Sequence, residues 1–413
     1  MVKPHLAGHL TINPKHSRAL NQIENPPSRI NTPAMNSKSV LEKRSNKFLP
    51  SSHSTIAVAR RRMFVMRFRT FENHFDQQNF TPMKKIKVAQ FGLGPIGIET
   101  LKLAASKPWI EIVGGIDIDP AKVGKPLAEI IGDKNVGNAS VYGSLDELVA
   151  INKPDVIFHT AVSKVRAAYA QIEPMVRHGI SVVSSCEELL FPQLREPELA
   201  AKLDAACKAG GARVLGTGVN PGFVMDVLPV CLTGVCRNVK AVHVQRVVDA
   251  TTRRGPLQKK IGSGLAPEEF ERLFHEGKAG HAGLKESAAL IAHCLGWKLD
   301  ELIETGKAMV ALQDIHTPHV SVKRGQCCGI HQLAVGRVNG EVKITLDIKM
   351  YLQAPNPHDA CQVDGEPAMN MIINGGVAGD GATVASLVNA APRILKAPPG
   401  LLLMTDIGVP SFA

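Results

Sequence analysis

The feature that most constrains the fold is an apolar segment that leads directly into a glycine-rich turn. Residues 86–91 form the apolar segment, and Gly92, Gly94 and Gly97 complete the pattern G-x-G-x-x-G. In a dinucleotide-binding unit the first glycine permits a tight turn, the second lets the backbone approach the pyrophosphate, and the third lets helix and strand pack closely. A helical pattern follows, and the free N–H groups of its first turn would face the phosphates. The segment therefore predicts a strand, a turn and a helix that bind a dinucleotide.

The residues around this turn fit the same interpretation. Pro95 suits the first turn of a helix, because its missing N–H would have no partner there. A second apolar run over 110–116 ends at Asp117, 20 residues beyond Gly97, where a carboxylate can bond a ribose hydroxyl. The alternative interpretation is an ordinary glycine turn followed by a surface aspartate. We expect the following residues to contact the cofactor: Gly92, Leu93, Gly94, Pro95, Ile96 and Asp117.

Short apolar strands alternate with helices from residue 84 to residue 222, which predicts a Rossmann-type, doubly wound parallel sheet of the α/β class. The expected strands are 86–91, 110–116, 154–159, 180–185 and 213–216, and the expected helices are 95–106, 164–178 and 194–209.

The pattern changes after Gly222 to that of an α+β domain with an open antiparallel sheet. The expected strands are 240–250, 308–322, 326–338, 341–352 and 368–374, and the expected helices are 266–276, 284–295 and 380–395. Asn339-Gly340 joins two alternating runs and is a strong hairpin signal. The predicted units are a disordered basic leader (1–82), an NAD(P)-binding domain (83–222), a substrate and dimerisation domain (223–378), and a C-terminal helix and tail that pack back on the Rossmann domain (379–413).

The leader differs from the rest of the chain in charge. Residues 1–83 contain 13 Lys and Arg but only 4 Asp and Glu, so they carry +9 of the formal net charge of +11. They lack sustained apolar periodicity and cannot bury enough surface to offset the entropy of ordering. Three origins stay open: a reading frame extended upstream of a true start at Met83, which we favour, a cleavable organellar presequence around Arg60-Arg61-Arg62, or a nucleic-acid-binding arm.

Composition narrows the function classes for the remaining residues. Their net charge is small, so we expect no nucleic-acid partner. No run approaches 18 uninterrupted apolar residues, so we expect no membrane span. The eight cysteines form no paired C-x-x-C pattern, which is typical of a reduced cytosolic protein and not of a disulfide framework or metal site. We expect a cytoplasmic location, or an organellar one if the leader is a presequence.

In an open parallel sheet, ligands bind beyond the carboxyl ends of the strands. Small residues after strand 154–159 place Thr160 and Ala161 beside a cofactor. Glu187 follows strand 180–185 at the mouth of the cleft, where partial burial raises a carboxyl pKa and suits it for proton transfer. Glu188 stays open as an alternative, as does a structural role at a helix N-terminus.

Two later segments complete the expected site. Asn220, Pro221 and Gly222 form a rigid turn where the chain leaves the first domain, so they would touch nicotinamide and substrate, or act as a hinge. Phe223 and His281 are the expected substrate contacts, although His281 would equally cap a turn.

These residues together resemble the dihydrodipicolinate-reductase-like superfamily, and more closely the 2,4-diaminopentanoate dehydrogenases and related native amine dehydrogenases. The matching segments occur in order over residues 84–413: G-L-G-P-I-G at 92–97, S-C-E-E-L at 185–189, G-x-N-P-G-F-x-M-D at 218–226, G-H-A-G-L-x-E-S at 280–287, L-G-W at 295–297, G-D-G-A-T-V-A-S-L-V-N-A-A-P-R at 379–393, and P-P-G-L-L-L-M at 398–404.

The resemblance implies an NAD(P)-dependent enzyme that interconverts a small amine and a ketone plus ammonia. It also implies a catalytic carboxylate at Glu187 and a homodimer through the antiparallel sheet. Asp117 favours NAD, whereas Lys122 and Lys125 lie close enough in sequence to receive a 2′-phosphate, so we expect both NAD and NADP to be used.

Two alternatives to this function stay open. A 4-hydroxy-tetrahydrodipicolinate reductase is disfavoured, because the chain lacks that enzyme's double-histidine motif followed by Lys and its A-P-S-G-T stretch. The other is a non-catalytic NAD(P)-sensing regulator with the leader as a nucleic-acid arm.

Overall fold

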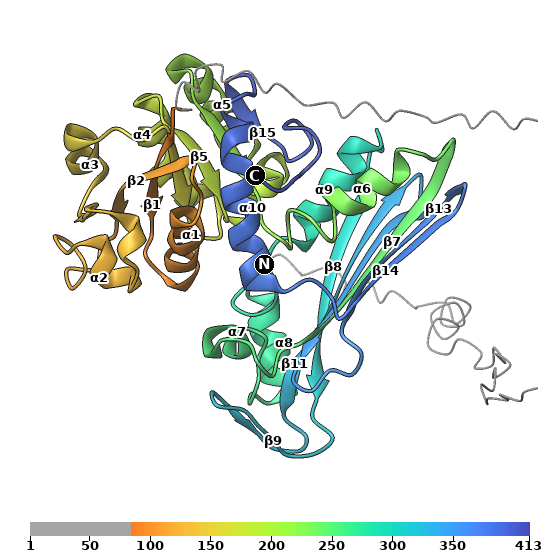
Figure 1. The fold of residues 1–413 in the computed structure, drawn as a ribbon. Helices are drawn as coiled ribbons and strands as arrows, with labels where there is room; N and C mark the ends of the chain where they lie inside the picture. The colour runs from red at the N-terminus through yellow and green to blue at the C-terminus, as the bar shows by residue number, and fades with distance from the viewer. Residues whose placement is uncertain (1–83) are drawn as a thin grey trace, which may run out of the picture. The chain divides into compact units, whose positions relative to one another are not determined.

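The computed structural model describes residues 84–413, and the predicted leader of residues 1–82 lies outside the described residues. The described chain contains two large sheets, which we call the parallel sheet and the mixed sheet (Figure 1). None of the helices in residues 84–413 is long and apolar enough to span a membrane.

The parallel sheet has seven strands in the order β15-β6-β5-β4-β1-β2-β3, and every neighbouring pair is parallel. Its strands are β1 (Ile86–Phe91), β2 (Ile110–Ile116), β3 (Val141–Tyr142), β4 (Val156–His159), β5 (Ser181–Ser184), β6 (Arg213–Gly216) and β15 (Gly400–Leu402). The helices associated with it are α1 (Pro95–Ala105), α2 (Leu127–Ile131), α3 (Leu145–Ile151), α4 (Val165–Arg177), α5 (Pro197–Gly210) and α10 (Gly379–Ile394).

Helices cover both faces of this sheet, as the apolar strands predict. Val88 and Phe158 pack on the face covered by α1 and α10, whereas Ala89 and Ile157 pack on the face covered by α4. Successive strand residues point to opposite faces, so burial on both faces requires apolar residues at every position. The predicted doubly wound sheet is confirmed.

The C-terminal segment returns to the parallel sheet. Helix α10 packs against α1, and β15 then adds a seventh strand by pairing in parallel with β6. The sequence predicted the helix but not the strand, because three apolar residues after two prolines carry no readable periodicity.

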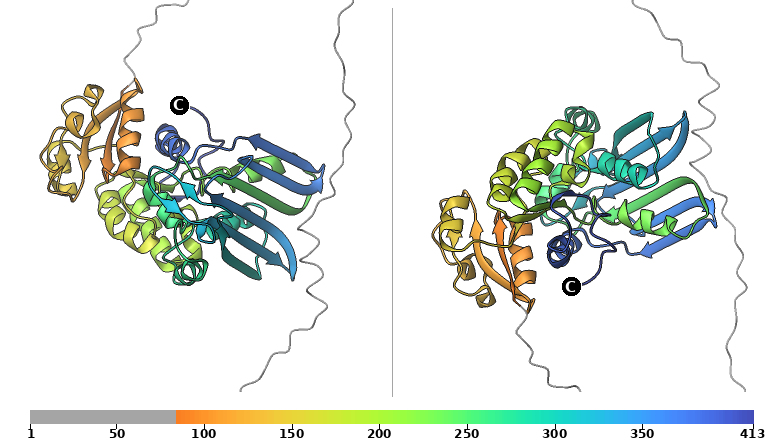
Figure 2. Two further views of the ribbon diagram at one scale, coloured as in Figure 1. Left: turned by 90° about the horizontal axis from the view of Figure 1, so that it is seen from below. Right: turned by 90° about the horizontal axis from the view of Figure 1, so that it is seen from above.

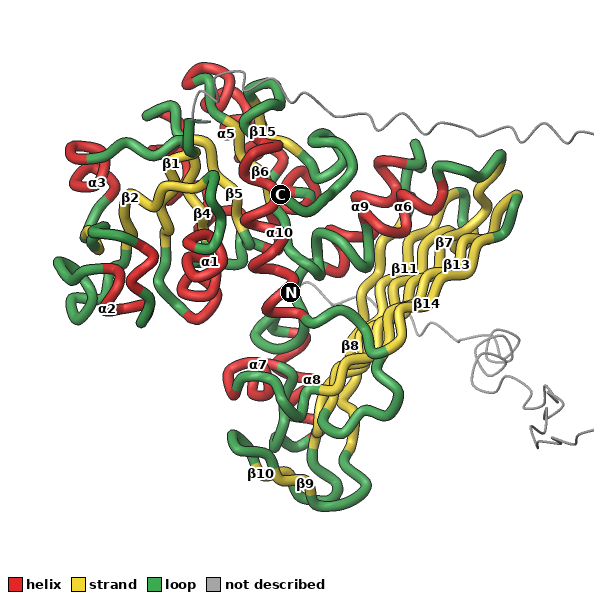
Figure 3. The backbone as a smooth tube through the Cα atoms, viewed as in Figure 1, coloured by secondary structure: helices red, strands yellow, loops and turns green. Residues whose placement is uncertain are grey.

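The mixed sheet has six strands in the order β14-β13-β7-β12-β11-β8 (Figure 3). Its strands are β7 (Asn238–Asp249), β8 (Glu301–Val310), β11 (Cys327–Val338), β12 (Glu341–Tyr351), β13 (His358–Glu366) and β14 (Met369–Asn374). The helices of this part of the chain are α6 (Val227–Thr233), α7 (Gly255–Lys260), α8 (Pro267–His275) and α9 (Leu284–Cys294). Figure 2 shows the strands of this sheet, in green, cyan and blue, from two further sides.

The expected antiparallel pairing holds for every neighbouring pair except one. Strands β7 and β12 run parallel, with Val242 opposite Ile344. The connection from β7 to β12 is long and includes three helices and strands β8 and β11, and parallel neighbours need a long connection of this kind. The Asn339-Gly340 hairpin is confirmed between β11 and β12, and both residues have positive φ, 51° and 77°.

One strand prediction in this sheet was wrong, and one strand was missed. A strand was expected over 308–322, but β8 ends at Val310, and the chain then leaves the sheet in a loop with a small hairpin of β9 (Ile315–His316) and β10 (Ser321–Val322). Strand β13 was not predicted, because its polar residues mask the alternation.

Candidate active site

The glycine loop, residues 92–97, has the geometry that its sequence predicts. Gly92 has φ +87°, a conformation that favours glycine. A Cβ atom on Gly97 would lie 2.0 Å from the Gly92 carbonyl oxygen, so only glycine allows α1 to approach β1 this closely. A Cβ on Gly94 would meet no atom within 4 Å, which leaves open space beside the start of α1. No side chain caps the N-terminus of α1, so its first-turn amides are available to an anion.

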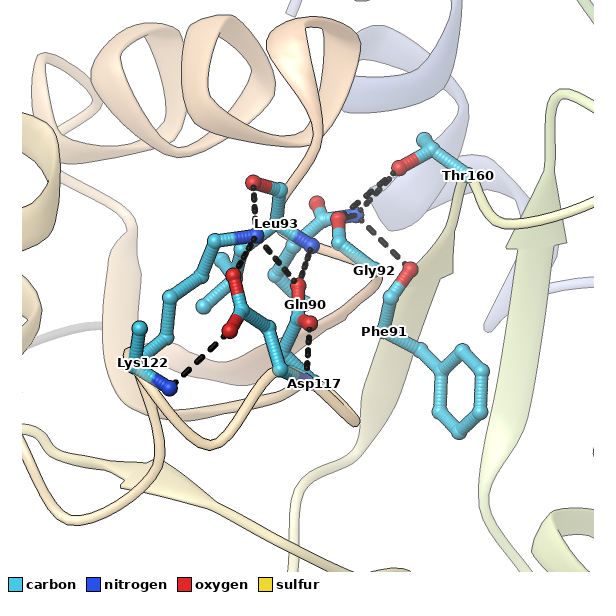
Figure 4. Close-up of polar contacts among 9 residues, drawn as sticks. Gln90, Phe91, Gly92, Leu93, Asp117, Lys122 and Thr160 are labelled. Carbon is cyan, nitrogen blue, oxygen red and sulfur yellow. Dashed lines mark hydrogen bonds and ion pairs between the residues drawn. The ribbon is translucent and has the colours of Figure 1, made fainter.

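Asp117 and Lys122 hold Leu93 of this loop from one side (Figure 4). The Leu93 N–H donates to Asp117 Oδ2 at 2.8 Å, and Lys122 Nζ donates to the Leu93 carbonyl and to Asp117 Oδ2, each at 3.2 Å. Burial raises the pKa of Asp117, but the Asp119 and Leu93 amides and the Lys122 ammonium together hold it below its usual value. Asp117 therefore stays ionised beside the loop.

Gln90 holds the loop from the other side, and the sequence analysis missed it. Its Nε2 donates to the Thr160 hydroxyl at 2.8 Å and to the Gly92 carbonyl at 3.1 Å (Figure 4). The Thr160 hydroxyl in turn donates to the Gly92 carbonyl at 3.1 Å. The available signal was an amide side chain within an otherwise apolar strand. Gln90 is fully buried in the structure, and buried polar groups need hydrogen-bond partners.

An open cavity of about 330 Å³ lies at the carboxyl ends of the parallel strands, and residues of the mixed-sheet region line its other side. Seven of the predicted site residues line it: Ile96, Thr160, Ala161, Glu187, Asn220, Pro221 and His281. The rest of the glycine loop, Asp117, Gly222 and Phe223 lie outside its wall.

The side chains of the two candidate acids, Glu187 and Glu188, have different surroundings in the structure. Glu187 lines the cavity with its side chain 23% exposed, and its Oε1 lies 3.9 Å from Lys260 Nζ. Burial raises the pKa of Glu187 above its usual value, although the Lys260 ammonium and the Ser163 side chain oppose the shift. Glu188 points elsewhere, because its Oε2 accepts the Val165 N–H at 2.8 Å at the start of α4.

The turn at 218–226 is held in shape by a buried carboxylate. Asp226 accepts the Gly222 N–H at 2.8 Å and the Ser287 hydroxyl at 2.6 Å, and it is fully buried. Gly222, whose φ is +124°, is therefore fixed in the turn by its bond to Asp226 and does not line the cavity. Phe223 packs against the apolar cores and lines a separate cavity of about 260 Å³ with Phe412, so the structure does not place it beside the other predicted substrate contact.

Two predicted residues of the cavity wall carry buried polar atoms without a partner among residues 84–413. Both side-chain atoms of Asn220, Nδ2 and Oδ1, are buried without a partner among residues 84–413. The same holds for Nε2 of His281, whose backbone N–H and carbonyl are both bonded by the side chain of Gln332, at 2.9 and 2.8 Å. Burial, with the nearby charges of Lys260 and Arg246, lowers the pKa of His281 to about 3, so the imidazole is neutral.

A group of cations in the cavity wall was not predicted. Its members come from β7, α7 and the loop between them: Arg246, Arg253, Arg254 and Lys260. Arg246 is buried and pairs with Asp359 at 2.6 Å, and Arg253 and Arg254 both pair with Asp380 at 2.8 Å. Sequence patterns carry no signal for such a group, because its approach to Glu187 depends on the packing of distant segments.

The arrangement combines an uncapped helix N-terminus, a cavity at the strand ends, one half-buried acid and an excess of cations. Among residues 84–413, no group of three or more His, Cys, Asp or Glu side chains is arranged to hold a metal ion. Proton transfer by Glu187 next to a bound dinucleotide is the chemistry that these residues support.

Comparisons with known proteins identify relatives of this chain. Residues 223–413 match the model of the 2,4-diaminopentanoate dehydrogenase C-terminal domain. The chain is 33% identical to 2,4-diaminopentanoate dehydrogenase of Acetoanaerobium sticklandii over 334 residues, covering 79% of this chain and 95% of that protein. It is 25% identical to an amine dehydrogenase of Streptomyces virginiae, covering 78% of this chain and 96% of that protein.

The fold is also found in solved structures. The amine dehydrogenase from Mycobacterium smegmatis aligns with a TM-score of 0.70 at 21% identity, over 79% of this chain and 97% of that one. Scyllo-inositol dehydrogenase from Lactobacillus casei, solved with NAD(H), aligns with a TM-score of 0.50 at 13% identity, over 78% and 93% of the two chains. At these identities the two structures support the fold alone. The identity and coverage of the A. sticklandii protein show that the chain belongs to the 2,4-diaminopentanoate dehydrogenase family.

Proposed function

We propose that this protein is an NAD(P)-dependent dehydrogenase that converts a carboxylate-bearing primary amine, of the 2,4-diaminopentanoate type, to a ketone plus ammonia, and catalyses the reverse reaction. The observation that carries the proposal is the position of Glu187, in one cavity with a group of cations, at the strand ends beyond the glycine loop. The A. sticklandii relative bears the name of this activity.

The residues present fit a nicotinamide dinucleotide. The open space at Gly94 and the uncapped start of α1 suit the pyrophosphate. Asn220 offers one buried donor and one buried acceptor, which complement the amide of a nicotinamide. The bound cofactor supplies the hydride acceptor or donor, and the protein supplies orientation and proton handling.

Glu187 handles the protons in this proposal. In the oxidative direction its carboxylate takes a proton from the substrate ammonium, because only the neutral amine can release hydride from its carbon. Glu187 then releases that proton to solvent, and the regenerated carboxylate accepts a proton from the water that adds to the iminium carbon. It passes this proton to the amine nitrogen, so that the C–N bond breaks and ammonia leaves, and it transfers the remaining hydroxyl proton to ammonia as the C=O bond of the ketone forms. A pKa raised by burial suits a group that both accepts and donates protons near neutral pH.

The charge of the cavity wall favours an anionic group on the substrate. Four cationic side chains line the cavity against two carboxylates, those of Glu187 and Asp380, and Asp359 pairs with Arg246 from outside the wall, so the group carries one positive charge in excess. His281 is neutral. A substrate carboxylate would meet Arg253 or Lys260 in a partly desolvated site, where charge pairs strengthen. A simple alkylamine has no anionic group that could pair with these cations.

Two further features belong to the proposal. Both NAD and NADP are accepted, since Asp117 and Lys122 lie together at the ribose end.

The protein forms a homodimer through the face of the mixed sheet opposite α8 and α9, where Ile303 and Ile372 are 43% and 57% exposed. Light scattering on the purified protein measures the mass and tests the dimer.

The test is a substrate panel that compares a carboxylate-bearing diamine with a simple alkylamine. 2,4-Diaminopentanoate and 2-aminopentane are offered with NAD and with NADP, and the appearance of reduced cofactor is followed by its absorbance. We expect turnover of the diamino acid with a KM far below that of the alkylamine. Turnover of tetrahydrodipicolinate but of no amine would contradict the proposal, as would binding of the dinucleotide without turnover of any member of the panel.

A further inference from the structure

The side chain of Lys122 occupies a particular place at the cofactor site. Its Nζ lies 3.2 Å from Asp117 Oδ2 and 3.2 Å from the Leu93 carbonyl (Figure 4). It also lies 3.6 Å from Asp119 Oδ2. Lys122 is therefore the cation that neutralises the acid at the end of β2 while it also holds the glycine loop.

Lys125, the other lysine near this acid in the sequence, is placed differently. Its Nζ pairs with Glu129 at 3.7 Å, one turn along the chain, and its side chain is 48% exposed. Lys122 is 27% exposed and faces an acid that is only 10% exposed. Electrostatic interactions weaken with exposure to solvent, so Lys122 exerts the larger effect at this site.

The acid marks where the adenosine ribose lies. A carboxylate at this position of a dinucleotide-binding unit bonds the ribose 2′-hydroxyl of NAD, and the 2′-phosphate of NADP occupies the same place. A phosphate monoester brings a charge of about −1.5 to −2 at neutral pH. Without Lys122, that charge would meet Asp117 and Asp119 alone. With Lys122, one ammonium stands within 3.6 Å of both acids and can turn to the phosphate.

The hydrogen bonds that Asp117 makes are compatible with either cofactor. Its Oδ2 is engaged by the Leu93 N–H and Lys122, whereas its Oδ1 accepts, among residues 84–413, only the Asp119 N–H at 2.9 Å. A second lone pair on Oδ1 is therefore available to a ribose hydroxyl. NAD would bind without disturbing Lys122, but NADP would draw Lys122 away from Asp117 and Leu93.

We propose that Lys122 is the residue that admits NADP to a site otherwise built for NAD. The inference rests on the dinucleotide binding proposed above but not on the amine substrate. NAD binds more tightly than NADP to the unaltered protein, because the three charges at the site sum to −1, and NADP binds measurably because Lys122 offsets one acid.

Equilibrium binding of NADH and NADPH to the full chain tests this proposal without any turnover. Nicotinamide fluorescence is titrated for the wild type and for the variants Lys122→Met, Lys122→Arg and Lys125→Met, and thermal melting checks that each is folded. We expect Lys122→Met to raise the Kd of NADPH about tenfold or more, and the Kd of NADH less than about threefold. Lys122→Arg retains both affinities within about threefold, and Lys125→Met changes neither.

A reciprocal variant guards against a Lys122→Met protein that fails to fold. In Asp117→Asn the amide oxygen can still accept the Leu93 N–H, but the like charge that faces the phosphate is gone. The ratio of the NADPH Kd to the NADH Kd should fall about tenfold. Equal weakening of both cofactors by Lys122→Met would overturn the proposal, because it would show that Lys122 only braces Leu93. An unchanged NADPH affinity would overturn it too, and a wild type that binds neither cofactor would refute the proposed function as well.

Discussion

Replacing Glu187 by Gln removes the proton-transfer group while keeping the shape of the side chain. The amide cannot take a proton from the substrate ammonium or from water, and general acid–base help of this kind contributes about 10²–10⁴-fold. That range corresponds to about 3–5 kcal/mol of transition-state stabilisation. We therefore expect kcat to fall by about 10²–10⁴ in Glu187→Gln.

The fold should tolerate this change. Glu187 makes one ion pair, with Lys260 at 3.9 Å, and both side chains retain contact with solvent. Pairs of this exposure contribute less than about 1 kcal/mol to stability. Apart from Ile96, the glycine loop and Asp117 lie outside the cavity wall, so the Kd of NADH should stay within about threefold of the wild-type value.

Glu188→Gln is the matched control, because the same substitution is made one residue along the chain. Glu188 accepts the Val165 N–H at the start of α4, and a Gln oxygen can keep that bond without its charge. Its loss of stability should be about 0.5–1 kcal/mol with kcat nearly unchanged. The assay follows the initial rate of cofactor reduction with 2,4-diaminopentanoate and, separately, NADH fluorescence. Equal losses of activity in both variants, or a loss of NADH binding in Glu187→Gln, would refute the assignment.

The remaining predictions concern the proton-transfer pair and the glycine loop. In the oxidative direction kcat/KM should rise as pH rises through the raised pKa of Glu187, because the carboxylate must be ionised to accept a proton. Lys260→Met removes the ammonium that lowers this pKa, so the ascending limb should move to higher pH, and an unmoved limb would exclude Glu187 as the titrating group. Gly94→Ala should leave the melting temperature unchanged but weaken NADH binding, because its Cβ enters open space beside α1. Gly97→Ala should lower the melting temperature, because its Cβ would lie 2.0 Å from the Gly92 carbonyl oxygen, and the reverse order of melting temperatures would contradict this account of the loop.

The parts of the site that were predictable from sequence are those that local patterns encode. The glycine loop is read within one strand, one turn and one helix, and strand ends in a parallel sheet meet at one edge, so Glu187 and Asn220 were found from position alone. Position also favoured Glu187 over Glu188, because Glu187 lies closer to the strand end. The structure adds that the Glu188 carboxylate accepts the N–H of Val165, which sequence alone could not show.

The parts that sequence reasoning missed depend on packing between distant segments. Arg253 and Lys260 approach the cavity from α7 and the loop before it, and no local pattern marks them as neighbours of Glu187. The parallel pairing of β7 with β12 and the addition of β15 to the first sheet are likewise settled by which apolar faces meet, and strand order is not encoded in the alternation of a single strand.

The central claim is that hydride leaves the amine-bearing carbon of the substrate for a bound nicotinamide. It is tested most directly with 2,4-diaminopentanoate that carries deuterium on both amine-bearing carbons, C2 and C4, and with unlabelled NAD. The account predicts that the deuterium appears in the reduced cofactor, and that ketone and ammonium form in amounts equal to it. Reduced cofactor without deuterium, or ketone formed without reduced cofactor, would contradict it.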